Sequence, residues 1–294
     1  MTEQDKIDKF KFQIVYLFPI LASLVFGLGC ASLLMRQSQS TVVPQSTPFS
    51  NNTPAAPLDN ALYFLVIIAI SAGVFYLLIK RRSKKIIKGL IVVAMTLASL
   101  LLSLVYLNAL LAYFPSLDVL FVIIILSVAI TGLFDLAIFR LGSIPRNVAV
   151  VGIGGALGIF FGFSISMYSG LWSAVLILVF LAVYDIFAVY RGPVGKIAQS
   201  SAGMEQLQGL SFAFKDIEMG LGDLVFYSML TGAMFFSFNN SILPGLVSIV
   251  GIMAGSVITF FILEKKGIFP GLPFPIMLGL AGGLITGLVI LPLL

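Results

Sequence analysis

The sequence predicts an all-α polytopic membrane protein with nine transmembrane helices. Of its 294 residues, 60% are hydrophobic and only 10% are charged, whereas a soluble globular domain is about 25% charged. Nine apolar runs also approach or exceed the length of about 20 residues that spans a bilayer as a helix. They cover approximately residues 12–35, 61–79, 89–113, 117–139, 148–167, 169–190, 219–237, 242–263 and 268–292.

We expect one membrane domain over residues 1–294. Residues 1–167 would form an N-terminal scaffold of five to six spans, and residues 168–294 would supply spans six to nine. The weakest division lies between spans five and six, where only Ser166 to Gly170 separates the two apolar runs. Because the first run, residues 12–35, is longer than the apolar core of a typical signal peptide, a cleaved leader is not expected.

The positions of the basic residues predict the orientation. If the amino terminus is cytoplasmic, 16 of the 17 Lys and Arg residues fall on the cytoplasmic side and only Arg36 falls outside. Cytoplasmic loops carry the excess of positive charge in membrane proteins. Nine spans therefore place the amino terminus in the cytoplasm and the carboxyl terminus outside, and the basic balance reports topology rather than nucleic-acid binding.

The side chains that are missing limit the chemistry. The chain has no histidine and a single cysteine, Cys30, inside an apolar run. Imidazole is thus excluded as a base or metal ligand, and an internal disulfide cannot form. We expect no metal and no cofactor, so any acid–base chemistry falls to carboxylates.

Away from the outer interface, three carboxylates lie within the predicted spans, namely Asp135, Asp185 and Asp223. Ionisable groups in hydrocarbon are costly and usually face a protein interior or a wet cavity. Asp185 and Asp223 are expected near the cytoplasmic ends of spans six and seven, which run in opposite directions, so the two can share one depth. Asp135 lies near the end of span four, where an interfacial ion pair with a neighbouring loop is the simpler expectation.

Two carboxyl groups a few ångström apart cannot both ionise readily, so the pair is expected to hold one proton. An aspartic protease needs this state, because the ionised member takes a proton from water while the protonated member binds the developing oxyanion. Gly220 and Gly222 would let a helix or a substrate backbone approach Asp223. A proton- or cation-coupled transporter or leak channel would use the same two aspartates, and a scaffold role would only pair the spans.

Three segments resemble a known family. Val183 to Val189 with Gly192-Pro193 resembles the Tyr-Asp segment of presenilins, Gly220 to Ser228 resembles their Gly-x-Gly-Asp segment, and Pro270-Gly271-Leu272-Pro273 resembles their Pro-Ala-Leu-Pro segment with glycine for alanine. The chain is similar to archaeal presenilin homologues, which are GxGD-type intramembrane aspartyl proteases. Signal peptide peptidases share the motifs but have the opposite orientation, which the charge count disfavours.

The resemblance implies a function and a set of site residues. Asp185 and Asp223 would be the catalytic dyad, Tyr184 would lie on the substrate side of Asp185, and Gly220, Leu221 and Gly222 would support Asp223. Residues Pro270, Gly271, Leu272 and Pro273 would contact the site and the substrate at a broken helix start, where the prolines lack backbone donors. Substrates would be single-span membrane proteins cleaved near the cytoplasmic side.

The connection 191–219 is much shorter than the large presenilin loop, so self-cleavage there is not expected. Its middle, 199–209, is expected to be mobile and to gate the dyad. Compactness predicts that no accessory subunit is required. We expect the protein in the plasma membrane of a prokaryotic cell. A transporter of the inverted-repeat type should show paired broken helices, and only span nine has such a start.

Two glycine ladders at four-residue spacing complete the pattern: Gly154, Gly158 and Gly162 in span five, and Gly279, Gly283 and Gly287 in span nine. Small residues on one helix face permit close packing of backbones. We expect packing within one subunit rather than a dimer interface.

Overall fold

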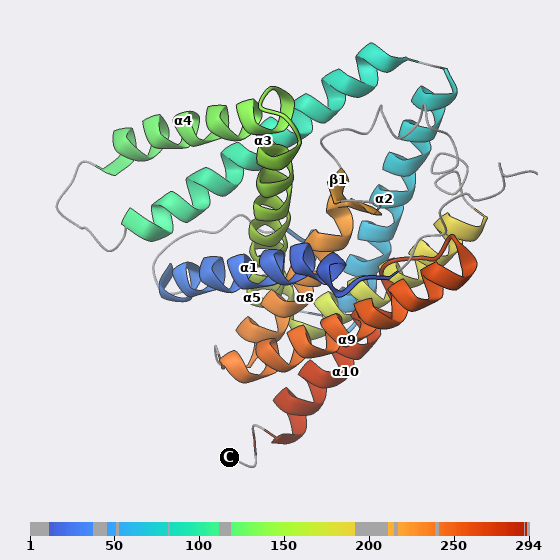
Figure 1. The fold of residues 1–294 in the computed structure, drawn as a ribbon. Helices are drawn as coiled ribbons and strands as arrows, with labels where there is room; N and C mark the ends of the chain where they lie inside the picture. The colour runs from blue at the N-terminus through green and yellow to red at the C-terminus, as the bar shows by residue number, and fades with distance from the viewer. Residues whose placement is uncertain are drawn as a thin grey trace, which may run out of the picture.

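Helices make up most of the structure (Figure 1). A computed structural model of the chain describes residues 12–37, 46–50, 53–81, 83–111, 119–191, 211–214, 217–238, 241–290 and 292. The helices are α1 (Phe18–Gln37), α2 (Ala56–Lys80), α3 (Lys84–Leu111), α4 (Val119–Phe139), α5 (Ser143–Tyr190), α8 (Leu221–Ser237), α9 (Ile242–Lys266) and α10 (Pro273–Ile285). A 3₁₀ turn, Ile14–Leu17, precedes α1, and a π-helical turn, Thr286–Ile290, continues α10.

Within the described residues, six helices are long and apolar enough to cross a bilayer, and two shorter apolar helices cover 221–237 and 273–289. Helix α5 has 48 residues, which at 1.5 Å per residue is roughly 72 Å, more than twice the thickness of the hydrocarbon layer. It is not one straight helix. Gly170 interrupts it with non-helical dihedral angles, φ 76° and ψ 169°, so α5 has two arms that meet where the sequence predicts a turn.

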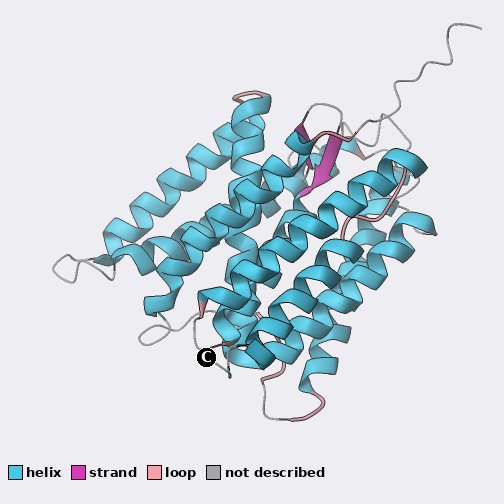
Figure 2. Ribbon diagram, turned by 60° about the horizontal axis from the view of Figure 1, so that its bottom comes forward, coloured by secondary structure: helices cyan, strands magenta, loops and turns pink. Residues whose placement is uncertain are grey.

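Two short strands depart from the all-α prediction. Strands β1 (Ser211–Phe214) and β2 (Ile217–Gly220) pair antiparallel, with Ser211 opposite Gly220. Four-residue strands are too short to show the alternating pattern by which a strand is recognised in a sequence. Figure 2 shows them at one end of the helical bundle, with the carboxyl terminus at the other end. The remainder of the connection 191–219, residues 192–210 and 215–216, lies outside the described residues, and this includes the predicted gating segment 199–209.

Helix α8 is the centre of the packing, because it contacts α5 along its length and also α1, α9 and α10. The first glycine ladder makes the contact with α5 close. A Cβ atom built on Gly154 would lie 2.9 Å from Cβ of Leu224, and one on Gly162 would lie 2.6 Å from the carbonyl oxygen of Met229. Only glycine allows the two helix backbones to approach this far.

The second ladder packs on the same helix from α10. A Cβ atom on Gly279 would lie 2.7 Å from Cδ2 of Leu230, and one on Gly283 would lie 2.6 Å from Cγ of Met234. Both ladders therefore pack within the subunit, as the sequence predicts, and hold α8 between α5 and α10.

Candidate active site

Asp223 lies in the first turn of α8, immediately after β2. Gly220 ends the strand with extended dihedral angles, φ −69° and ψ 142°, and the helix begins at Leu221. The partial positive charge at a helix amino terminus favours a carboxylate there. The Asp223 side chain is partly buried.

Asp185 comes from the second arm of α5, five residues before this helix ends at Tyr190. Helices α5 and α8 pack against each other. The Asp185 carboxyl group lies close enough to Asp223 for the two groups to interact electrostatically. The structure thus brings together the two carboxylates that the sequence singles out.

A third segment joins them at the start of α10. Between Lys266 and Pro273 the chain is irregular, beginning with Gly267 at φ 76° and containing the buried Pro270. The backbone N–H of Leu272 donates a hydrogen bond of 3.0 Å to Oδ2 of Asp185. The carbonyl oxygen of Gly271 accepts a hydrogen bond of 2.9 Å from the hydroxyl of Tyr227. Two backbone groups that a regular helix would use internally are therefore bound to the site.

Gly271 approaches Asp223 directly. A Cβ atom at Gly271 would lie 2.9 Å from Oδ2 and 3.3 Å from Cγ of Asp223. Glycine is not required here by the backbone conformation, because Gly271 does not have a positive φ. Its benefit is steric, because the absent side chain leaves room for the carboxyl group.

The glycines beside Asp223 do not have the expected packing role. A Cβ atom at Gly220 or Gly222 would come no closer than 3.8 Å to any described neighbour, and both residues are exposed. Leu221 is buried and packs on the first ladder near Gly154. Tyr184 is partly buried on α5.

Tyr227 is a site residue that the sequence did not identify, although it lies within the Gly220 to Ser228 segment. It follows Asp223 by four residues, so both side chains lie on the same face of α8. That spacing could have identified it, but its partner, the Gly271 carbonyl, is 44 residues away and only the fold brings it near.

A small cavity of about 100 Å³ adjoins Asp223. Four polar side chains line it, from Asp223 and Tyr227 on α8 and from Ser256 and Thr259 on α9. Apolar side chains close the rest of the wall, including Ile20 of α1 and Phe260 of α9. Asp223 therefore lines a small cavity with both polar and apolar walls inside an otherwise apolar bundle.

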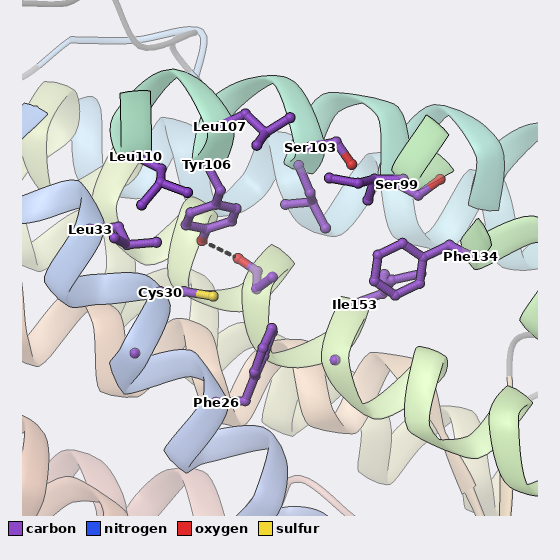
Figure 3. Close-up of a pocket in the computed structure, with 15 residues that line it drawn as sticks. Phe26, Cys30, Leu33, Ser99, Ser103, Tyr106, Leu107, Leu110, Phe134 and Ile153 are labelled. Carbon is purple, nitrogen blue, oxygen red and sulfur yellow. Dashed lines mark hydrogen bonds between the residues drawn. The ribbon is translucent and has the colours of Figure 1, made fainter. Parts of the chain in front are cut away.

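A larger cavity of about 350 Å³ lies apart from the aspartates, between α1, α3, α4 and α5. Figure 3 shows apolar side chains around it, with the Tyr106 hydroxyl donating a 2.7 Å hydrogen bond to the Ala156 carbonyl across it. Its lining contains no carboxylate, so hydrolysis by a carboxylate pair is not expected there.

Asp135, the third carboxylate within the apolar segments, has a different surrounding. Its Oδ2 accepts a 2.8 Å hydrogen bond from the Thr96 hydroxyl of α3. The expected ion pair with a neighbouring loop is not found among the described residues, where the Thr96 hydroxyl is the partner of Asp135 instead.

The comparisons with known proteins decide the family. The model of a family described as signal-peptide peptidase, presenilin aspartyl protease matches residues 24–212. The chain belongs to this family. The matched range includes Asp185 and ends before Asp223. No curated protein matches the chain.

Solved structures agree with this membership at the level of the fold. One structure of a presenilin family intramembrane aspartate protease is 23% identical over 93% of this chain and 98% of its own, with a TM-score of 0.60. A second crystal form is 22% identical over 97% of this chain and all of its own, also with a TM-score of 0.60. The protein is thus a multi-pass membrane protein of an intramembrane aspartyl protease family.

Proposed function

We propose that the protein is an endopeptidase that hydrolyses single-span helical substrates near the cytoplasmic side, with Asp185 and Asp223 as its dyad. The observation that carries this proposal is the convergence of both carboxyl groups on Gly271-Leu272. One of them is hydrogen bonded to the Leu272 amide and the other is in contact range of Gly271.

The chemistry follows from a shared proton. The ionised carboxylate takes a proton from water, whose oxygen bonds to the scissile carbonyl carbon, while the protonated carboxyl group hydrogen bonds the carbonyl oxygen. The C–N bond then breaks, and the leaving nitrogen takes the proton that the water gave up. No group outside the chain is needed.

The substrate would bind in an extended form beside residues Pro270 to Pro273, with Tyr184 and the exposed Gly220 and Gly222 on its path. A helical substrate must unwind, because its internal hydrogen bonds shield the scissile carbonyl. The open space around both glycines supports a backbone approach there, now by substrate rather than by a helix of the chain.

We further propose that the eight described helices give nine crossings, because the Gly170 break divides α5 into two arms that each match a predicted span. The amino terminus would be cytoplasmic and the carboxyl terminus outside, in a prokaryotic plasma membrane. The two strands, the second of which directly precedes α8 and Asp223, lie towards the end of the bundle away from the carboxyl terminus, which agrees with this arrangement (Figure 2). The single chain would act without accessory subunits.

The transporter hypothesis depends on the same aspartates. The family match is to proteases, and among the described helices the irregular start of α10 has no counterpart in the first half of the chain. Both observations favour proteolysis over transport as the proposed function.

The test is cleavage of a single-span substrate by the purified protein in liposomes. Asp185→Asn and Asp223→Asn should each lower cleavage to background, because each removes one carboxyl group from the pair. Asp135→Asn is the matched control, since Asp135 is also a carboxylate within an apolar helix but contacts Thr96 instead. Cleavage that survives in either dyad variant would refute the dyad, and aspartate-dependent ion flux without cleavage would favour the transporter.

A further inference from the structure

The cavity beside Asp223 has the properties of a water site. A buried water occupies about 30 Å³ and needs two to four polar partners. The cavity, at about 100 Å³, has room for about three waters, and four polar side chains face it. Empty cavities in proteins are apolar, whereas this one is not.

The four polar side chains around the cavity differ in the hydrogen bonds that they can still form. Tyr227 donates its hydroxyl proton to the Gly271 carbonyl, and Ser256 donates its own to the Ile252 carbonyl at 2.8 Å. These two hydroxyls can still accept hydrogen bonds, as can the Asp223 carboxylate. A water placed among them would find acceptors for its protons.

Thr259 is the exception. Its side chain is buried, 6% exposed, and within the described part of the chain its hydroxyl has no hydrogen-bond partner. Buried Ser and Thr hydroxyls in helices usually bond the carbonyl four residues earlier, as Thr231, Ser256 and Thr286 do here. The Thr259 hydroxyl makes no such bond, and neighbouring atoms cover its oxygen, although its side chain lines the cavity. A turn about χ1 would bring the hydroxyl to the cavity, where it can donate a hydrogen bond to a water oxygen.

We propose that Thr259 and Ser256 hold a store of water from which the hydrolytic water reaches Asp223, with Thr259 as the positioning residue. This inference rests on the proposed function. Leaving a buried hydroxyl unpaired costs free energy, which explains why Thr259 would be bound to water rather than bare. Asp185 does not line the cavity, so water arrives from the Asp223 side of the pair.

The first test removes the hydroxyl without changing the shape. Thr259→Val should lower kcat for the single-span substrate about three- to tenfold, the value of one hydrogen bond, with KM unchanged. Thr259→Ser should restore most of the rate. Thr131→Val is the matched control, because Thr131 is also 6% exposed and also lacks a described hydroxyl partner but lies on α4 and does not line this cavity.

Equal rates for Thr259→Val and wild type would overturn the inference, as would an equal loss in Thr131→Val. A change in KM alone would also overturn it, because a stored water acts on the chemical step. If the wild-type protein cleaves and only the inference is wrong, the dyad variants still lose activity while Thr259→Val does not.

The second test does not depend on proteolysis. Cys30 is the only cysteine, so Thr259→Cys and Thr131→Cys can be compared in a Cys30→Ala background. Thiols react as thiolates, which form where water reaches them. Silver ion should protect the thiol of the Thr259→Cys variant, but not that of Thr131→Cys, from a maleimide added after unfolding. The mass of the protein then shows how much maleimide was bound. Lack of protection at position 259 would show that the cavity is dry.

Discussion

The backbone amide of Leu272 and the carboxyl group of Asp185 are joined by a 3.0 Å hydrogen bond, although 87 residues separate them. The donor has no partner within the helix, because Leu272 is the N-cap of α10 and the first amides of a helix have no internal acceptor. The irregular start of α10 is therefore a positioning element for Asp185.

Removing that donor should impair catalysis. Leu272 has φ −78°, which proline can adopt, so Leu272→Pro deletes the N–H with little backbone change. A hydrogen bond to a charged group contributes about 1.5–3 kcal/mol, and we expect kcat to fall roughly 10- to 100-fold. Leu272→Met keeps the amide and should lose far less. Equal losses in the two variants would assign the effect to the side chain.

A methyl group at position 271 should displace Asp223. Gly271→Ala would place Cβ 2.9 Å from Oδ2 of Asp223, a distance that forces the carboxyl group to move. We expect a clear drop in kcat with a small change in melting temperature in detergent. Gly132→Ala, where no described atom lies within 4 Å, is the control. Full activity in Gly271→Ala would show that the carboxyl group has room to shift.

The glycine ladder should not accept side chains. In Gly158→Ala the new methyl would meet the Val225 carbonyl and lie 2.6 Å from Cβ of Ser228. Overpacking of this kind costs about 1–3 kcal/mol, more than the gain of up to about 1 kcal/mol from helix propensity. The melting temperature should therefore fall. Gly29→Ala, in open space on α1, should leave it unchanged or raise it.

The break in α5 should also require glycine. Gly170 has φ 76° and ψ 169°, a region that only glycine occupies readily, and a strained residue costs about 1–3 kcal/mol. Gly170→Ala should lower the melting temperature, whereas Gly73→Ala within α2 should not. If both variants melt like the wild type, the chain turns at another residue.

Much of the site could be predicted because its residues are rare in apolar helices. Asp185 and Asp223 are conspicuous as carboxylates within apolar segments. The prolines at positions 270 and 273 indicate an irregular start of the last helix. Spacing also places both ladders on helix faces. These signals depend on single residues or on residues close together in the chain, so they can be recognised in the sequence.

The remaining contacts join distant parts of the chain. The Tyr227 hydroxyl meets the Gly271 carbonyl, and Gly271 meets Asp223, only because α8 and the start of α10 pack together. Gly220 and Gly222 look like packing glycines in the sequence, yet the close approaches are at Gly154, Gly158 and Gly162.

The two ladders have a mechanical consequence. Glycines of α5 pack closely on the backbone of α8, and glycines of α10 pack on its Leu230 and Met234 side chains, so a sideways slip of α8 would meet steric clashes on both sides. Asp223 is therefore the stationary member of the pair. Any rearrangement that aligns the proposed dyad would therefore fall to Asp185 or to residues 267–272 rather than to α8.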